Sequence, residues 1–403
     1  MKVLLVGSGG REHALAWKLA SATSLTELHA APGNPGIASL GSCHPVRADD
    51  GEGLLALARG LAVDLVVIGP EAPLVGGVAD ELRHAGIAVF GPGRAAAQIE
   101  GSKLFAKDVL RAAGVPTAEP LAVARAPCVV KADGLAAGKG VFVCRTAAEL
   151  DRGLAAVAVY GGNIVIEELL EGEEVSVFAL CDGANAAALP AAQDFKRIGE
   201  ADTGPNTGGM GSYSPVALEA DEIVDTVHRP VLAELAARGA PFVGTLYAGL
   251  MLTEDGPRVL EFNCRFGDPE TQSILPRLDV DLLTALAAAA AGEVRGVDVG
   301  VAEGAAVTVV LAAAEYPARG DSGSPIDGTS EAEQTGALVF HAGTAVHGGR
   351  LVTNGGRILN VTACARSVAE ARSRAYAACE LISFPGMRYR RDIALDPGLR
   401  AVH

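Results

Sequence analysis

Residues 129–141 read VVKADGLAAGKGV, and this stretch decides how the middle of the chain folds. The apolar runs at its two ends predict strands, and the glycines between them predict a flexible loop. Lys131 and Lys139 carry compact ammonium charges that suit phosphate oxygens. The pattern is not a Walker A motif, because no Ser or Thr follows Lys139 and no helix follows the loop. We expect a lid over a triphosphate, in which Gly138 and Gly140 let the loop close; a solvated surface loop is the alternative.

A second motif, IVIEELLEGEEVS at residues 164–176, follows the lid along the chain. It predicts a strand that ends near Glu167 and runs into an acidic turn. Backbone groups near Glu168 and Leu170 could read the edge of an adenine ring, and the Glu174 carboxylate could accept ribose hydroxyls. Alone, such a turn would be solvated charge; after a triphosphate lid, it predicts an adenine hinge.

The third motif is VLEFNCRFGDPETQ at residues 259–272. Alternate side chains of a strand share a face, so Glu261 and Asn263 present two oxygen ligands together. That pair suits Mg²⁺, or the similar Mn²⁺, bridging the phosphates of ATP. Arg265 follows on the same side, where it could stabilise charge on a transferring phosphoryl group. A buried carboxylate–amide pair is the alternative, but the lid and hinge upstream favour the metal.

The first hundred residues alternate strands and helices, which predicts a doubly wound parallel sheet. Strands are expected at 2–6, 64–68 and 87–90, and helices at 11–20 and 75–85.

Between the first strand and the first helix lies the glycine turn GSGGRE, residues 7–12. Such a turn brings backbone N–H groups close to a phosphate. A dinucleotide fingerprint needs a third glycine where Glu12 stands, and an acid after the next strand, so NAD or FAD is disfavoured. We expect a phosphate-bearing substrate here, with a structural tight turn as the alternative.

The rest of the chain divides into three further parts. Residues 122–187 hold short β-rich runs and one helix near 146–157, the size of a small α+β subdomain. The alanine-rich run 282–291 is too short to span a membrane and predicts a buried helix. In the last part, Asn354-Gly355 lies between two alternating runs and predicts a hairpin, with a helix at 367–381. The expected division is an N-terminal α/β substrate-binding domain at 1–101, a catalytic domain at 102–121 plus 188–325, a lid subdomain at 122–187 and a small mixed β/α C-terminal domain at 326–403.

Composition limits the class of protein. The 403 residues are 49% apolar and 20% charged, which is typical of a globular multidomain protein. A net charge of −15 argues against nucleic-acid binding. Seven scattered cysteines without CxxC spacing, no visible signal peptide and no membrane-length apolar run predict a cytoplasmic protein with reduced thiols. No apolar seam is evident, so we expect a monomer.

Lid, hinge and Glu-x-Asn strand, in this order, resemble the ATP-grasp superfamily. The chain resembles more closely the glycinamide ribonucleotide synthetases, or phosphoribosylamine–glycine ligases, of purine biosynthesis. The resemblance runs from Met1 to the RYRRDI segment and rests on GPEAPLV, EGSKLFAK, the lid, QDFKRIGEADTGPNTGGMGSYSP, EFNCRFGDPETQ and TNGGRILNVTA. It implies that ATP, glycine and 5-phosphoribosylamine give ADP, phosphate and glycinamide ribonucleotide through glycyl phosphate.

The resemblance also implies roles for particular residues. Lys103 and Lys131 would contact the ATP phosphates, Glu174 the ribose, and Glu261 and Asn263 the metal. Arg265, Asp268 and Lys131 would be catalytic. The candidates for substrate contacts lie in four places, the glycine turn, the end of the strand at 64–68, the DFKR segment at 194–197 and the Gly-rich 204–211 loop: Gly9, Gly10, Glu12, Gly69, Pro70, Glu71, Asp194, Lys196, Arg197, Asn206, Gly208 and Gly209.

The sequence departs from the family pattern in places, and three other classes of protein remain as alternatives. The strand before Glu-x-Asn carries no additional acid, and residues 313–326 match the family only loosely. The rivals are another ATP-grasp enzyme of purine biosynthesis, such as a carboxylase or formyltransferase, a nucleotide-binding oxidoreductase and a non-catalytic regulatory binder. Glu12 argues against the oxidoreductase, and the intact Glu261/Asn263 pair argues against the binder.

Overall fold

The N-terminal part of the chain is the parallel sheet that the alternating pattern predicts. The structure is a computed structural model that describes residues 1–136 and 139–395. The strand order in this sheet is β3-β2-β1-β4-β5, and all pairs are parallel. The order reverses between β1 and β4, so their carboxyl ends flank the crevice where such sheets bind ligands. The elements are β1 (Lys2–Gly7), α1 (Gly10–Ala20), β2 (Glu27–Pro32), α2 (Pro35–Ala38), β3 (Ser42–Cys43), α3 (Gly51–Leu61), β4 (Leu65–Ile68), α4 (Glu71–Gly76), α5 (Val78–His84), β5 (Val89–Phe90), α6 (Arg94–Gly101) and α7 (Lys103–Ala112).

Two expectations for this domain are wrong in detail. The helix expected at 75–85 is interrupted, because Gly77 takes a left-handed φ of 93° between α4 and α5. The strand expected at 87–90 is reduced to Val89–Phe90. Neither change moves the crevice.

Long antiparallel strands form the centre of the molecule: β9 (Glu173–Asp182), β10 (Ala186–Asp194), β14 (Val243–Thr253) and β15 (Gly256–Asn263). β14 lies between β9 and β15, and β10 pairs with the other edge of β9. Leu246 of β14 packs in one core with α10 (Arg229–Ala237), and the neighbouring Tyr247 packs in a second core with α12 (Leu282–Ala291). The sheet is therefore covered on both faces, and the buried helix predicted at 282–291 is confirmed.

The lid subdomain is a separate small sheet in the order β7-β6-β8, covered by α8. Its elements are β6 (Cys128–Ala132), β7 (Val141–Cys144), α8 (Ala147–Val157) and β8 (Ile164–Glu167). The Thr146 hydroxyl and the Glu149 side chain form a capping box at the start of α8, as the sequence there favours. The core of the subdomain contains six buried side chains in one cluster, so it is small beside the cores of the central sheet.

The C-terminal strands extend the central sheet. The short β13 (Gly211–Ser214) pairs with β10 on one side and with β16 (Ala305–Ala312) on the other, and β21 (Arg357–Ala365) and β18 (Leu338–His341) complete eight strands. Helix α14 (Val368–Cys379) packs against this part of the sheet. The Ser367 hydroxyl accepts a hydrogen bond from the Glu370 N–H and caps the predicted helix.

The hairpin predicted at Asn354-Gly355 is wrong. β20 (Arg350–Gly355) pairs with β19 (Thr344–His347) and β17 (Asp321–Pro325) in a separate sheet, whereas β21 belongs to the large one. The tight turn is at Gly348-Gly349, where both residues have positive φ, as a two-residue hairpin of the I′ type requires. Asn354-Gly355 carries the chain from one sheet to the other.

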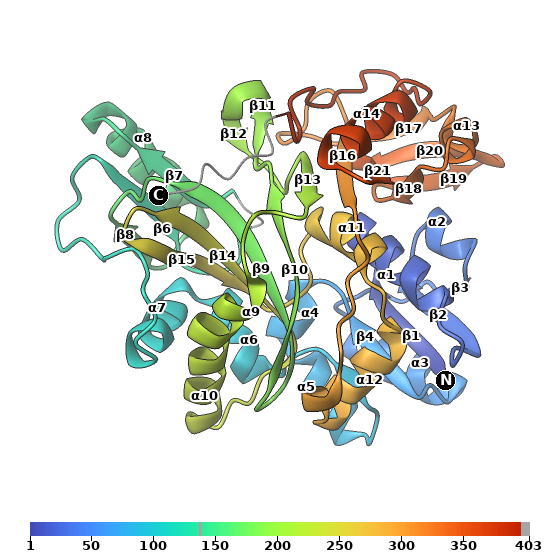
Figure 1. Cartoon of the computed structure of the whole chain (residues 1–403), viewed down its shortest axis with the longest axis horizontal. Helices are drawn as coiled ribbons and strands as arrows, with labels where there is room; N and C mark the ends of the chain where they lie inside the picture. Colours follow the sequence, from blue (N-terminus) through green and yellow to red (C-terminus); the bar gives the residue numbers. More distant parts are fainter. Residues whose placement is uncertain (137–138, 396–403) are drawn as a thin grey trace.

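Figure 1 shows how these parts are arranged. The N-terminal domain (blue) and the C-terminal strands (orange to red) lie on one side, the lid subdomain (teal) on the other, and the long central strands between them. A small hairpin of β11 (Arg197–Gly199) and β12 (Thr203–Asn206) stands between the lid and the C-terminal domain. The remaining α-helices of the described residues are α9 (Ala220–Ile223), α11 (Glu270–Ile274) and α13 (Thr329–Gln334), and a π-helical turn at Val224–His228 joins α9 to α10. Among the described residues, none of the helices has the length and apolar character needed to cross a bilayer.

Candidate active site

Strand β15 presents the predicted metal pair on one face. Glu261, Asn263 and Arg265 are half-buried, and the residues between them are buried, which is the alternation of a strand with one face on a core. Glu261 lies opposite Gly249 of β14, and Asn263 lies opposite Tyr247. A Cβ at Gly249 would lie 3.4 Å from the Cγ of Glu261, so glycine leaves room beside the carboxylate.

This donor set fits a hard divalent cation. Carboxylate and amide oxygens are ligands that Mg²⁺ and Mn²⁺ accept. In residues 1–136 and 139–395 there is no group of three or more His, Cys, Asp or Glu side chains that could hold a metal ion. Two protein ligands would leave the other positions to phosphate oxygens and water, the usual arrangement for a cation that arrives with a nucleotide.

A polar cluster surrounds the metal pair and makes its environment negative. The Nζ of Lys196 lies 2.7 Å from an Asp194 oxygen and 2.9 Å from a Glu174 oxygen. Burial raises the pKa of Asp194 to about 6 and also raises the pKa of Glu174, and the charge of Glu261 adds to both shifts. Burial opposes the charge of Lys196, but the two carboxylates outweigh it and raise the pKa of that lysine. The excess of carboxylates favours a further cation here.

The floor of the cluster is a chain of buried hydroxyl and carboxyl groups. The Ser176 Oγ lies 2.9 Å from the Tyr247 hydroxyl, and it donates to an oxygen of Glu270 at 3.3 Å. All three side chains are almost fully buried, and Glu270 starts α11 directly after residues 264–269, the signature turn between β15 and α11. The turn is thus bound to β9 and β14 through this chain.

Two lysines share one buried carboxylate where the lid joins the central sheet. Glu167 forms ion pairs with Lys131 of β6 and with Lys107 of α7, whose Nζ lies 2.7 Å away. Lys131 also donates to the carbonyl oxygen of Leu260 at 3.1 Å. Because Leu260 precedes Glu261, this bond brings the first lid lysine beside the strand that carries the metal pair.

Lys103 lies at the start of α7 and is linked to the beginning of the lid loop. Its Nζ donates to the Gly134 carbonyl oxygen at 2.9 Å, and its backbone N–H donates to Asp133 at 2.7 Å. Burial lowers the pKa of Lys103, and the nearby charge of Glu261 offsets part of that shift. Lys103, Lys131 and Glu261 therefore come together although they belong to different parts of the chain.

The hinge is fixed by one side chain. An oxygen of Glu168 accepts hydrogen bonds from the Glu119 N–H and from Arg258, both at 3.0 Å. These bonds tie the end of β8 to the segment before β6 and to β15. Leu170 follows and is half-buried. One oxygen of the Glu168 carboxylate is occupied by these bonds, and the adenine contact of the hinge backbone stays a prediction.

The end of the lid loop reaches the C-terminal domain. The Nζ of Lys139 donates to the Pro317 carbonyl oxygen at 3.0 Å, and the Tyr160 hydroxyl donates to the Lys139 carbonyl oxygen at 3.1 Å. Gly140 packs so closely on the side chain of Ala136 that a Cβ there would collide with it. Gly138 lies outside the described residues.

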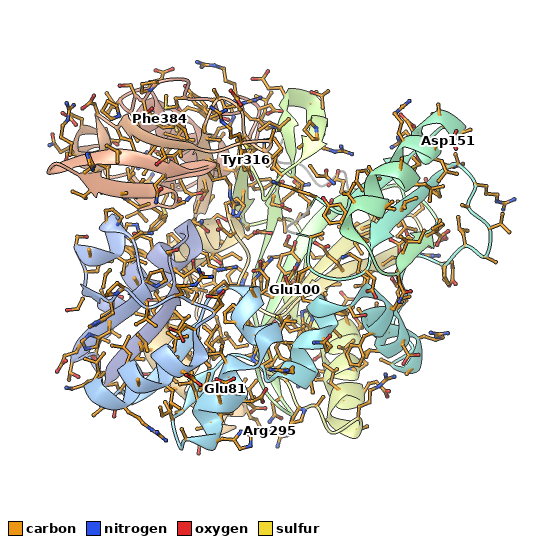
Figure 2. All side chains as sticks on the ribbon, turned by 180° about the vertical axis from the view of Figure 1, so that it is seen from behind. Glu81, Glu100, Asp151, Arg295, Tyr316 and Phe384 are labelled. Carbon is orange, nitrogen blue, oxygen red and sulfur yellow. The ribbon has the colours of Figure 1, made fainter. Side chains whose placement is uncertain are left out.

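Arg265 is held by two carboxylates from the N-terminal part of the chain. Its Nη2 lies 3.4 Å from Glu100 and its Nε lies 3.5 Å from Glu71, while Nη2 also donates to the Asn263 oxygen at 3.2 Å. Glu100 sits near the centre of the molecule in Figure 2, and its other oxygen accepts from the Cys264 N–H at 2.8 Å. Burial opposes the charge of Arg265, but the two carboxylates outweigh it and raise its pKa. The N-terminal domain therefore orients this guanidinium.

The glycine turn of the first domain is filled by Glu12. One oxygen of Glu12 accepts from the Gly9 N–H at 2.6 Å, and the other accepts from Arg11 at 2.6 Å. A Cβ at Gly69, which precedes Pro70 at the end of β4, would collide with the same carboxylate. The Gly9 amide thus already has an acceptor, and the crevice presents acidic groups, which suit hydroxyl or amine donors of a ligand.

Asp268 links the signature turn to the C-terminal domain. It lies 3.0 Å from the Nη2 of Arg357, and Gln272 donates to its other oxygen at 2.8 Å. Arg357 also donates to the Asp268 carbonyl oxygen at 2.8 Å and to the carbonyl oxygen of Gly208. A Cβ at Gly9 would lie 3.6 Å from Asp268, so the crevice of the first domain opens beside this pair.

Gly10 closes the junction of three parts of the molecule. A Cβ at Gly10 would collide with the side chains of Asn360 on β21 and Gln272 on α11. The start of α1 therefore packs directly on the catalytic and C-terminal parts, and no larger residue fits.

The remaining predicted contacts lie in the loops around this junction. Asn206 approaches the carbonyl oxygen of Val141 on the lid at 3.5 Å, and Gly209, with φ of 107°, packs on Pro269 of the signature turn. Arg197 differs from these, because it donates to the Gly204 carbonyl oxygen within its own hairpin at 2.8 Å.

Sequence reasoning missed several residues of the site: Glu100, Lys107, Ser176, Tyr247, Glu270 and Arg357. Lys107 had a signal, because it lies four residues after Lys103 and so shares a helix face with it. Glu270 belongs to the motif at residues 259–272, where a closer reading could have found it. Arg357 gave no local signal, since its partner Asp268 lies in a distant part of the sequence.

These features together define the ATP-grasp class: a carboxylate–amide pair on a central strand, a lysine on a second small sheet and a glycine loop with another lysine between two strands of that sheet. The chain belongs to the phosphoribosylglycinamide synthetase family. Models described as its N domain, its ATP-grasp (A) domain and its C domain match residues 1–100, 101–271 and 306–396.

Named relatives agree with this family. The chain is 48% identical to the phosphoribosylamine–glycine ligase of Mesorhizobium japonicum, over 98% of this chain and 97% of that protein. It is 49% identical to that of Brucella melitensis, over 100% and 98%. The crystal structure of the Thermotoga maritima phosphoribosylamine–glycine ligase superimposes with a TM-score of 0.84 at 35% identity, covering 98% of this chain and 100% of that one. A biotin carboxylase domain from Hydrogenobacter thermophilus, at 19% identity and a TM-score of 0.70, shares the fold.

Proposed function

We propose that this protein ligates glycine to 5-phosphoribosylamine in purine biosynthesis, with conversion of ATP to ADP and phosphate, and releases glycinamide ribonucleotide. The observation that carries the proposal is the meeting of Glu261, Lys103 and Lys131 beside an acidic crevice of the first domain. Relatives that carry this activity in their names, and are alike over the whole chain, support it.

The chemistry follows from the groups that meet here. A carboxylate acylates an amine only after one of its oxygens becomes part of a leaving group. A carboxylate oxygen of glycine therefore attacks the γ-phosphorus of ATP, ADP leaves, and glycyl phosphate forms. The amine then attacks the acyl carbon and phosphate leaves. Both steps need aligned reactants rather than a protein nucleophile. Glycyl phosphate also hydrolyses in water, so the site must close during the reaction.

The triphosphate end of the site consists of cations. Lys103 and Lys131 neutralise phosphate oxygens from two sides, and Lys139 with Gly138 and Gly140 belongs to the loop that covers them. Glu261 and Asn263 would hold a divalent cation, which supplies charge neutralisation and alignment of the phosphates when it is bound. We propose Mg²⁺ or Mn²⁺ for this position.

The adenosine end is formed by the hinge. Glu167 keeps Lys131 in place through its ion pair, and the backbone of Glu168 and Leu170 reads the adenine edge. Glu174 accepts a ribose hydroxyl beside Lys196. Arg265, oriented by Glu71 and Glu100, stabilises the charge that develops on the transferring phosphoryl group.

The crevice of the first domain takes 5-phosphoribosylamine. Its acidic groups, Glu12 and Glu71, accept from ribose hydroxyls, and Arg357 is the cation available to the phosphate. Asp268 lies between this crevice and the metal pair, where it orients Arg357. The other contacts are proposed for the glycine turns and loops that line the same junction: Gly9, Gly10, Gly69, Pro70, Asn206, Gly208 and Gly209. Asp194, Lys196 and Arg197 are proposed for glycine and the transferred phosphate.

Four units share this work: 1–101, 102–121 plus 188–325, 122–187 and 326–403. The pairing of β16 with β21 along its length supports placing the start of the last unit earlier, at about Ala305. The protein is proposed to be a cytoplasmic monomer that binds neither nucleic acid nor membranes.

The test is ADP release, measured with glycine and with 5-phosphoribosylamine generated in the assay from ammonia and ribose 5-phosphate. ADP should form only when both substrates are present, and the amounts of ADP and glycinamide ribonucleotide formed should be equal. Bicarbonate and formate in place of glycine serve as controls for the rival ATP-grasp activities. ADP formation that ignores glycine and the amine would refute the proposal.

A further inference from the structure

The segment 313–319 connects two loops of the site, although its sequence resembles the family only loosely. The hydroxyl of Tyr316 accepts a hydrogen bond from the Gly208 N–H at 2.9 Å. The next residue, Pro317, accepts the lid bond from Lys139 at 3.0 Å. Figure 2 places Tyr316 on the inner edge of the C-terminal domain, toward the β11–β12 hairpin. One short segment therefore contacts both the lid and the substrate loop at 206–209.

Gly208 is held from both sides. Arg357 binds its carbonyl oxygen, and Tyr316 binds its N–H. The same arginine binds Asp268, so the position of Gly208 is tied to the signature turn. Tyr316 thus completes a clamp that fixes the two peptide planes on either side of the Gly208 Cα, beside the candidate substrate crevice.

The ring of Tyr316 is itself well anchored. It packs on Gly356, where an added Cβ would lie 2.5 Å from a ring carbon. The segment begins with a hydrogen bond from the Ala313 N–H to the Gly356 carbonyl oxygen at 2.8 Å, and Arg388 donates to the Ala314 carbonyl oxygen at 3.3 Å. The hydroxyl therefore projects from a braced part of the C-terminal domain and can act as a fixed point.

The lid contacts both the 206–209 loop and the 313–319 segment. Asn206, at the start of the substrate loop, approaches the Val141 carbonyl oxygen on the lid strand at 3.5 Å. Lys139 reaches Pro317. The lid, the 206–209 loop and the 313–319 segment thus contact one another in this structure, and a change in one of them alters the support of the others.

We propose that Tyr316 is a positioning residue for the ligation: its hydroxyl holds the 206–209 loop so that the lid, when it rests on Pro317, encloses the acyl phosphate before the amine attacks. The inference rests on the proposed function and assigns this role to the 313–319 segment.

The chemical consequence of losing this support is leakage. In an enclosed site the amine attacks the acyl carbon of glycyl phosphate, and phosphate leaves. In a site open to water, water attacks the same carbon, and glycine and phosphate are released without an amide. ATP is then converted to ADP and phosphate with no ligated product.

The test is the variant Tyr316→Phe in the full chain, with ADP and glycinamide ribonucleotide measured in the same reaction. Loss of one hydrogen bond should lower product formation about 3- to 10-fold. The ratio of ADP to product should rise from one to about two, because the leak consumes part of the acyl phosphate. The KM for ATP should change little, since Tyr316 contacts neither of the lysines proposed for the triphosphate.

Two further variants separate positioning from a merely structural role. Tyr389→Phe removes the same hydroxyl from a tyrosine of the same domain that lies outside the lid, the 206–209 loop and the 313–319 segment. Its ratio of ADP to product should stay at one. Gly356→Ala keeps the hydroxyl but displaces the ring, and it should reproduce the raised ratio. A ratio of one in both Tyr316→Phe and Gly356→Ala, whatever happens to the melting temperature, would overturn the inference. Wild-type protein that makes no product would instead overturn the proposed function, so the two failures are distinguishable.

Discussion

The central sheet and the lid both direct charge at the proposed triphosphate, but they hold that charge in different ways. Glu261 and Asn263 stand on a strand whose neighbours are covered by cores on both faces. Lys131 stands on a three-stranded sheet, and Lys139 lies in the loop between two of its strands; the core of this sheet has six buried side chains among the described residues. Side chains on the first element are pre-organised, whereas those on the second can move with their subdomain.

The two regions are joined mainly at the root of the lid, where Glu168 also bonds Arg258 of β15. Lys131 bonds the carbonyl oxygen beside Glu261, and Glu167 joins Lys131 to α7. At the far end, Lys139 rests on the C-terminal domain through one bond. The lid is thus anchored strongly at its root and lightly at its tip, which suits an element that opens for ATP and closes for the reaction.

The sharpest way to test the fixed region is to remove its carboxylate. Glu261→Ala should lower kcat about 10³-fold, because the cation between protein and phosphates loses an anionic ligand. The melting temperature should stay within about 3 °C of wild type, since Glu261 is half-buried and its loss relieves repulsion among the neighbouring acids. Steady-state ADP release and thermal denaturation measure the two effects.

Glu254→Ala is the matched control, because Glu254 is an exposed acid in the turn between β14 and β15. Its kcat should equal that of wild type. Near-normal turnover in Glu261→Ala would remove this residue from metal binding and with it the distinction between a fixed cation site and a moving lid.

The lid is tested at Lys131, where it joins the central sheet. Lys131→Met should lower kcat/KM for ATP about 10²-fold, because an ammonium that faces phosphate is lost. It should also destabilise the protein by about 3 kcal/mol, since Glu167 is buried and would keep only Lys107 as a partner. Activity assays and denaturant unfolding measure the two losses.

The double variant Lys131→Met/Glu167→Gln separates these losses. Removing the stranded charge should restore most of the stability and none of the activity. If activity returned together with stability, Lys131 would be a structural residue, and the lid would contribute no charge to the reaction from its root.

A matched pair of core truncations compares the regions directly. Leu246→Ala in the central strand β14 should cost about 3 kcal/mol of unfolding free energy. Leu150→Ala in α8 should leave the global unfolding transition nearly unchanged and raise the KM for ATP, because it loosens only the lid core. Hydrogen exchange should then rise in the lid elements β6, β7, α8 and β8 and not in β9 or β14 of the central sheet. An equal rise in both regions would show that the lid does not open separately.

Much of the site was predictable because its signals are local. The i, i+2 spacing of Glu261 and Asn263 predicts a shared face, and the structure shows the alternation that this requires. The glycine-rich run after Lys131 predicts a loop between two strands, and β6 and β7 pair on either side of it. Local spacing is enough where neighbours along the chain are also neighbours in space.

Other features depend on distant parts of the chain. Asn354-Gly355 has the sequence of a hairpin turn, but pairing of β21 with β16 and β18 draws the next strand into another sheet. Tertiary pairing overrides the local preference in this case. Arg357 reaches Asp268 and Gly208 only through the fold, and Glu12 fills a turn that the glycines alone suggested for phosphate. Arg357 lies far along the chain from Asp268 and Gly208, so no local pattern could link them. Glu12 differs, because it belongs to the same short motif as the glycines.

The smallest expected effect is on the pH dependence of stability, and it also distinguishes the central sheet from the lid. His228 is fully buried beside β14, with its Nε2 3.2 Å from the Leu246 carbonyl oxygen, and burial lowers its pKa from 6.5 to about 4. Between these two pKa values the histidine binds a proton in the unfolded chain but stays neutral in the folded chain. The free energy of unfolding therefore falls as the pH drops below 6.5 and continues to fall until about 4. At about pH 5.5 this histidine should cost about 1.4 kcal/mol relative to neutral pH.

Residues 122–187 contain no histidine, so the lid has no equivalent group. His228→Gln should reduce the slope of unfolding free energy against pH between about pH 7 and about pH 5, whatever its effect on absolute stability. Hydrogen exchange, corrected for its intrinsic pH dependence, should show acid loosening β9 and β14 more than β6 and β8. An unchanged slope in His228→Gln would mean that other groups carry the acid sensitivity, such as the buried His13 and the half-buried His341, whose pKa values are lowered by burial to about 3 and about 4.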